Sequence, residues 1–186
     1  FYMRHRILDV INLSLKNDKV EGIVEVDECF IKESFKGNHS KSTTFVMPRN
    51  PRKRGKGKND KKKRGISKEQ ICIETAIDRK GNILMSAVCN GRITTNQIIN
   101  FFDNKICEDA TFCVDSHKSY MAIKDKLNIE LKQVPRGKSM IDSVYHLQHI
   151  NALHSSFKRW LMTFNGVSTK YINTVSYTHL TLPTIA

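Results

Sequence analysis

The stretch "GIVEVDECFIK", from Gly22 to Lys32, combines apolar and polar residues in the way typical of a β-strand. Asp27 lies inside this otherwise apolar strand, and Glu25 points to the same face because side chains alternate along a strand. Burying an acid in such a place is costly unless a cation or hydrogen bonds compensate it. The stretch therefore predicts a core strand that carries an acid in need of such compensation.

Further elements follow from the hydropathy pattern on either side of this strand. Two β-rich runs around the turn "DRKGN" predict a hairpin over Gln70 to Cys89. Apolar residues at spacings of three and four predict helices, and short apolar runs predict strands. The predicted helices cover residues 3–16, 94–106, 118–127 and 144–164, and the later strands cover residues 110–115 and 129–134.

This order of elements predicts an α/β fold of the ribonuclease-H-like kind. Such a fold has a mixed sheet that starts with three antiparallel strands, continues through helices, and carries helices on its faces. A long polar segment, 33–66, follows the first strand and is expected to be a flexible, disordered basic insertion.

The chain divides into three parts on the same grounds. Residues 1–21 are expected to be a helical lead-in left from a truncated upstream region, and residues 22–174 the ribonuclease-H-like catalytic domain. The end of the chain, 175–186, contains "VSYTHLTLPT", whose back-translation resembles a sequencing adaptor. We interpret it as an artefactual tail. The alternative interpretation is a natural variable tail.

The net charge of +13 is concentrated in the insertion. Arg49 to Arg64 holds ten Lys or Arg residues and a single acid, Asp60. Basic segments of this kind bind nucleic acid by releasing counterions from phosphates. The alternative is a solvated loop without a dedicated partner. The predicted DNA-binding residues are Arg52, Lys53, Arg54, Lys56, Lys58, Lys61, Lys62, Lys63 and Arg64.

A second acid, Asp115, ends the apolar run "TFCVD". Taken singly, each acid could cap the turn that follows its strand. Taken together, Asp27 and Asp115 are what a fold needs in order to hold Mg²⁺ with oxygen ligands from neighbouring strands.

The last predicted helix contains "HINALHSSFKRW", and no Asp or Glu occurs from Ser143 to the end of the chain. Asn151, His154 and Lys158 share one face of it, at i, i+3 and i+7. An Asn oxygen can bind Mg²⁺, and a Lys can contact a phosphate. The alternative is an ordinary basic helix with a polar stripe. His146, His149 and His154 are interpreted as surface or core-edge residues, because no acid accompanies them on the helix.

Three segments, "VEVDECF", "CVDSHKSY" and "QHINALHSSFKRWLMTFNGVSTKYI", resemble bacterial insertion-sequence transposases with the D-D-N-K signature, a branch of the DDE superfamily. The resemblance implies four catalytic residues, Asp27, Asp115, Asn151 and Lys158, of which the first three would be metal ligands. It also implies a ribonuclease-H-like core that uses two Mg²⁺ or Mn²⁺ ions for DNA strand cleavage and strand transfer.

The resemblance further implies double-stranded DNA as the partner, both element ends and target, and a homo-oligomer assembled on that DNA. No run of 18 apolar residues is present, so no membrane partner is expected, and the expected location is the bacterial cytoplasm at the nucleoid. Scattered cysteines without a C-x-x-C pair fit a reducing compartment. The zinc ribbon and helix-turn-helix that usually precede this core have no counterpart before Asp27. Two alternatives remain: a non-catalytic DNA-binding module, or a structure-specific nuclease of the same fold.

Overall fold

The computed structural model describes residues 19–37, 43–48 and 65–174. The helix predicted over 3–16, the basic block of 49–64 with its predicted DNA-binding residues, and the tail of 175–186 lie outside these described residues. The described parts of the insertion, 33–37, 43–48 and 65–66, contain no helix or strand.

One five-stranded sheet forms the centre of the domain, in the order β3-β2-β1-β4-β5. The first strand is antiparallel to β2, and β2 is antiparallel to β3; on its other side β1 is parallel to β4, and β4 is parallel to β5. This mixed topology confirms the predicted ribonuclease-H-like fold. The strands are β1 (Ile23–Lys32), β2 (Gln70–Asp78), β3 (Ile83–Asn90), β4 (Thr111–Val114) and β5 (Glu130–Gln133).

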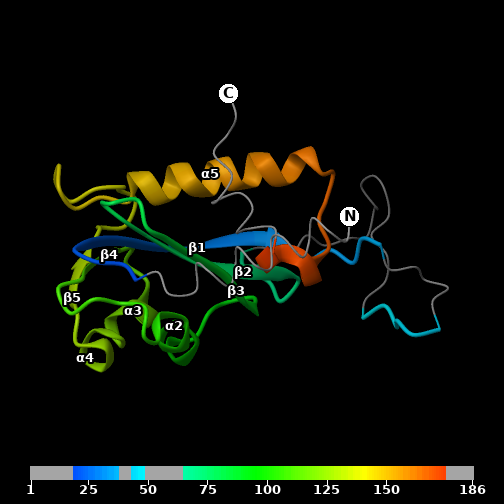
Figure 1. Cartoon of the computed structure of the whole chain (residues 1–186), viewed down its shortest axis with the longest axis horizontal. Coiled ribbons are helices and arrows are strands. Elements are labelled where there is room, and N and C mark those ends of the chain that lie inside the picture. Colours follow the sequence, from blue (N-terminus) through cyan, green and yellow to red (C-terminus); the bar gives the residue numbers. More distant parts are fainter. Residues whose placement is uncertain (1–18, 38–42, 49–64, 175–186) are drawn as a thin grey trace.

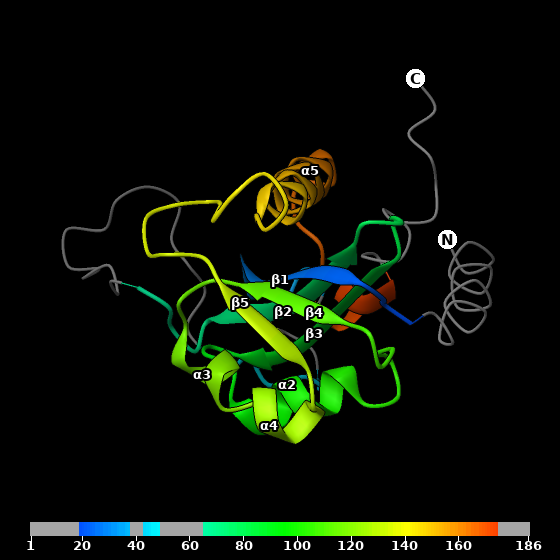
Figure 2. The ribbon, with the colours of Figure 1, turned by 90° about the vertical axis from the view of Figure 1, so that its left-hand side faces the viewer.

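Helices cover both faces of the sheet (Figures 1 and 2). Three short helices lie on one face, and the long helix α5 crosses the other face. A single 3₁₀ turn, η2 (Thr169–Tyr171), follows α5. The helices are α2 (Thr95–Phe102), α3 (Lys118–Met121), α4 (Lys124–Leu127) and α5 (Gln148–Thr163).

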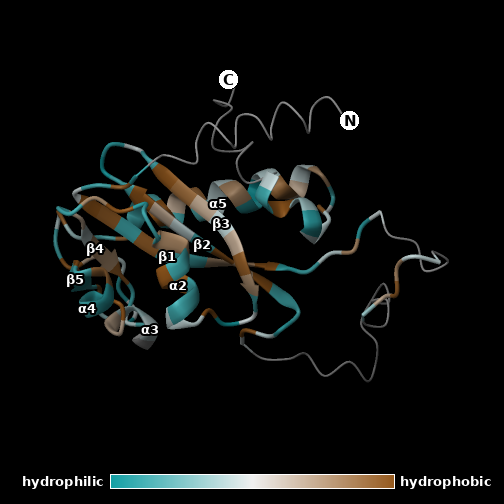
Figure 3. Ribbon diagram, turned by 60° about the horizontal axis from the view of Figure 1, so that its bottom comes forward, coloured by the Kyte–Doolittle hydropathy of each residue, from teal (hydrophilic) through white to brown (hydrophobic). Residues whose placement is uncertain are grey.

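Successive side chains of β1 point to opposite faces of the sheet, so the core has one layer on each face. Val24 and Val26 pack with Phe102 and Phe112 on the face of the short helices. On the other face, Cys29 packs with Phe157 of α5. Figure 3 shows hydrophobic residues concentrated along the strands between these two layers. The apolar stripe of α5 therefore fixes the helix across the centre of the sheet, directly over the odd-numbered residues of β1.

Three predicted helices differ from the observed ones at their ends. The segment 118–127 forms two short helices, because the N–H of Ile123 bonds to the carbonyl of Tyr120 in a tighter turn. Helix α2 stops at Phe102 because Ile106 pairs with Val20 as a β-bridge. Helix α5 starts at Gln148 rather than at 144 because the residues before it form a turn whose N–H groups donate to the side chain of Asp142.

Candidate active site

Asp27 lies in the middle of β1, on the face that α5 covers. Its side chain is 23% exposed, and its Oδ1 accepts a hydrogen bond from the N–H of Glu28 at 2.9 Å. The pKa of Asp27 is raised to about 7, chiefly by burial and also by the carboxylates of Glu28 and Asp115, while Lys158 acts in the opposite direction. Asp27 is therefore a carboxylate whose charge the surrounding protein compensates poorly.

Asp115 follows β4 directly and comes next to Asp27. The parallel register places Val26 of β1 beside Val114 of β4, and Asp27 and Asp115 each come one residue later in the chain. The Oδ1 of Asp115 accepts the N–H of His117 at 2.9 Å, so this acid does cap a turn. Its charge nevertheless raises the pKa of Asp27, as expected for two carboxylates that share one site. The structure thus brings the two predicted acids together at neighbouring strands.

Helix α5 brings Lys158 toward this pair but leaves Asn151 exposed. The Lys158 ammonium lowers the pKa of Asp27, which places the two side chains within electrostatic reach. The side chain of Asn151 is exposed and forms no hydrogen bond with any residue that the structure describes. Asp27, Asp115 and Lys158, three of the four predicted catalytic residues, therefore lie near one another. Asn151, the fourth, lies on α5 with Lys158, and its side-chain amide is free to bind a ligand.

His154, one turn after Asn151, faces Asp27 from α5. Only 6% of His154 is exposed, and its Nδ1 lies 3.8 Å from Oδ2 of Asp27. Burial lowers its pKa to about 4, and Lys158 contributes in the same direction. The imidazole is therefore neutral at physiological pH and holds an available lone pair.

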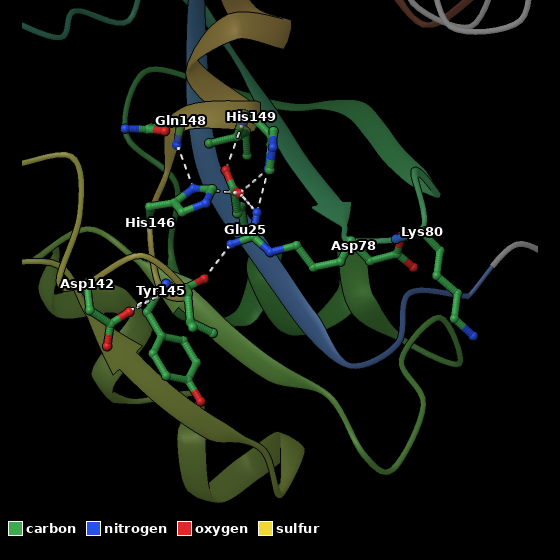
Figure 4. A network of polar contacts seen from close by, with 11 residues as sticks. Glu25, Asp78, Lys80, Asp142, Tyr145, His146, Gln148 and His149 are labelled. Carbon is green, nitrogen blue, oxygen red and sulfur yellow. Dashed lines mark hydrogen bonds and ion pairs between the residues drawn. The ribbon is translucent and has the colours of Figure 1, made fainter.

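Glu25, two residues before Asp27 on β1, fastens the start of α5 to the sheet (Figure 4). It is fully buried, and its Oε2 accepts the backbone N–H of Ile150 at 3.0 Å. Its Oε1 pairs with Arg79 and lies 2.8 Å from Nδ1 of His149 and 3.3 Å from Nδ1 of His146. Glu25 thus caps a helix that has no Ser, Thr, Asp or Asn at its own N-cap.

The same network has the donor set of a metal site. Ligand atoms of Glu25, His146 and His149 all lie within 4.8 Å of one another. No acid accompanies these histidines on the helix, which is why they were predicted to be surface or core-edge residues, but the acid comes from β1. Arg79 contacts both Glu25 and His149, and its Nη2 donates to the carbonyl of Val144 at 2.7 Å. A guanidinium therefore supplies the positive charge at this point.

A second pair of acids lies on the opposite face of the sheet and was not predicted from the sequence. Glu28 is the partner of Glu74 in the β1–β2 register, and Tyr120 donates a hydrogen bond to Glu74 at 2.9 Å. Burial raises the pKa of both acids, and repulsion between neighbouring carboxylates adds to it. Glu74 could have been found from the sequence, because it lies inside the apolar strand "QICIETAID" as Asp27 does in its own strand.

Comparison with known families identifies the domain. The sequence model of the ISXO2-like transposase domain matches residues 19–177, which is most of the chain. The chain belongs to this family. It is therefore a transposase domain of the DDE superfamily, as the three sequence segments indicated.

Similarity to solved structures and to curated proteins is limited. A solved chain from the crystal structure of a pre-cleavage Mos1 transpososome is similar, with 14% sequence identity and a TM-score of 0.39. The similarity covers 95% of this chain and 57% of that chain. No curated protein matched the transposase domain. Within the described residues of the transposase domain, no helix has the length and apolar character needed to cross a membrane.

Proposed function

We propose that this domain cleaves DNA and transfers the cut strand in the movement of an insertion sequence, as an enzyme of the D-D-N-K branch. Asp27, Asp115 and Asn151 are the proposed metal ligands, and Lys158 is proposed to contact a phosphate of the DNA. The observation that carries the proposal is the position of Asp27 on β1 next to the end of the parallel strand β4, where Asp115 follows, beneath the helix that holds Lys158.

The residues present fit a pair of Mg²⁺ or Mn²⁺ ions. Two carboxylates and an amide oxygen are hard oxygen ligands of the kind these ions prefer. The raised pKa of Asp27 supports a cation here, because a divalent ion would offset the burial and the repulsion between carboxylates that raise it. Bound ions would supply charge that activates the attacking oxygen and stabilises the leaving oxygen. Asp27 and Asp115 would orient that charge, and Lys158 would hold the scissile phosphate in line.

The proposed partner is double-stranded DNA, at the element ends and at the target, with several copies of the chain assembled on it. The basic insertion, through its residues between Arg52 and Arg64, is proposed to bind the phosphate backbone. The proposed place of action is the nucleoid in the bacterial cytoplasm.

The decisive experiment offers the purified 186-residue chain a pre-cut element end and a target duplex, with and without Mg²⁺. We expect metal-dependent joining by the wild-type protein and none by Asp115→Asn, which still binds the DNA. Cutting without joining would instead identify a nuclease. Binding without either reaction would identify a non-catalytic DNA-binding module.

The role of Asn151 is tested by Asn151→Leu, which removes the amide oxygen at similar volume. Because Asn151 is exposed and forms no hydrogen bond through its side chain within the described residues, the thermal midpoint should stay within about 2 °C. We expect a metal titration of strand transfer to shift to at least about tenfold higher Mg²⁺. An unchanged titration curve would show that Asn151 is only part of the polar edge of α5.

The basic insertion is tested through the salt dependence of DNA binding. Changing Lys58, Lys61, Lys62 and Lys63 to Gln should reduce the slope of log affinity against log salt by about three to four, since each phosphate contact contributes about 0.9. The matched control changes four exposed lysines elsewhere in the domain, Lys68, Lys124, Lys126 and Lys138. Equal slopes for both variants would mean that the insertion has no special part in DNA binding.

A further inference from the structure

The ring nitrogens of His154 form no hydrogen bond with the described residues. The Nε2 atom is buried and has no hydrogen-bond partner among the residues that the structure describes. The Nδ1 atom lies 3.8 Å from Oδ2 of Asp27, which is too long for a hydrogen bond. Neither ring nitrogen of His154 therefore has a hydrogen-bond partner among the described residues, and Nδ1, which faces Asp27, can bind a ligand through its lone pair while Nε2 carries the proton.

The distance between His154 and Asp27 suits two ligands of one ion. A metal ion binds an imidazole nitrogen or a carboxylate oxygen at about 2.1 Å, so two atoms on the same ion lie at most about 4.2 Å apart. The 3.8 Å between Nδ1 and Oδ2 falls inside this limit. Asn151, one turn earlier, is exposed, whereas His154 is buried against the acid itself.

We propose that His154 is a further ligand, through Nδ1, of the metal ion that Asp27 holds. This inference rests on the proposed function, because it assumes that Asp27 is a metal ligand. It changes the chemistry of the site: one ion would have a nitrogen ligand beside its oxygen ligands. Imidazole favours transition metals over Mg²⁺, so the site should prefer Mn²⁺.

The test is pulsed electron paramagnetic resonance on the purified 186-residue chain loaded with Mn²⁺. We expect the wild-type spectrum to show coupling to a directly bound ¹⁴N nucleus, and labelling the histidines with ¹⁵N should change that coupling accordingly. His154→Gln, which offers an oxygen at similar length, should lose the nitrogen coupling and bind Mn²⁺ about tenfold more weakly. Its affinity for Mg²⁺ should change much less.

Matched controls are His146→Gln and His149→Gln, which change the other histidines near β1. Both should retain the nitrogen coupling. If the coupling disappears in His149→Gln or His146→Gln and persists in His154→Gln, the ion binds at Glu25 instead and the proposal is overturned. A thermal melt of each variant shows whether it is folded, and His154→Asn provides a second, smaller replacement if the Gln variant unfolds.

The outcomes separate this inference from the proposed function. Mn²⁺ binding that requires Asp27 but shows no nitrogen coupling would overturn the role of His154 alone. Mn²⁺ binding that persists unchanged in Asp27→Asn, or no Mn²⁺ binding to the wild-type chain, would overturn both.

Discussion

Asp27→Asn is expected to abolish metal-dependent strand transfer and also to stabilise the metal-free domain at neutral pH. Activity should fall by at least about 10³-fold, because a bound ion contributes several kcal/mol to the transition state and Asp27 is its proposed ligand. The asparagine keeps the oxygen that accepts the N–H of Glu28, so the backbone of β1 should not change. Loss of function with a gain in stability is typical of a residue retained for chemistry.

The stability gain should depend on pH in a defined direction. The pKa of Asp27 is raised from 3.8 to about 7 in the folded chain, so the folded state binds this proton more tightly than the unfolded state does. The wild-type domain therefore loses stability as the pH rises from about 4 to about 7. The variant should be more stable by about 2–4 kcal/mol at pH 8 and by almost nothing at pH 4.

Urea unfolding of the metal-free proteins at several pH values measures this difference. Asp109→Asn is the matched control, because Asp109 is exposed and its replacement should leave the pH profile unchanged. Addition of Mg²⁺ should stabilise the wild-type protein and not Asp27→Asn. A variant less stable than the wild type at pH 8 would contradict the view that Asp27 is a poorly compensated charge.

The local pattern of the chain was enough to predict the sheet and its first acid. Alternation in Gly22 to Lys32 gives the strand and places Glu25 and Asp27 on one face, and the structure agrees. The apolar run "TFCVD" pointed to Asp115 and the helical spacing pointed to Lys158, and the fold brings both near Asp27. The positions of these side chains could be predicted because each depends on periodicity along a single strand or helix, whereas their catalytic roles stay predictions.

Contacts between distant segments could not be predicted in this way. Arg79 lies in the turn "DRKGN", where the sequence indicated only a hairpin, yet it bonds to Glu25, which is 54 residues away. The acid that accompanies His149 comes from β1, 124 residues earlier. Such pairings depend on the register between strands and on the position of α5 over the sheet, and neither follows from hydropathy alone.

Glu25→Ala is expected to loosen α5 and to cost about 3 kcal/mol of folding free energy. The carboxylate is fully buried, and its loss removes the acceptor of the Ile150 N–H and the partner of Arg79 at once. Breaking a buried charge pair by removing one member typically costs 3–5 kcal/mol, and the partial exposure of Arg79 places this case at the low end. Strand transfer should fall as well, even where the protein remains folded, because α5 positions Lys158 over Asp27.

Urea unfolding and hydrogen exchange at the first turn of α5 measure the two effects. Glu21→Ala is the matched control: Glu21 pairs with Lys80, whose side chain is 70% exposed, so its loss should change the stability little. Arg79→Met should also destabilise the domain, because it leaves Glu25 buried without its cation. The double variant Glu25→Met with Arg79→Met should recover part of the loss, since apolar side chains can replace a buried ion pair.

If Glu25→Ala unfolds no more easily than Glu21→Ala, the apolar contacts of Ile150 and Phe157 alone hold α5 over the acids of β1, and the polar network does not position it.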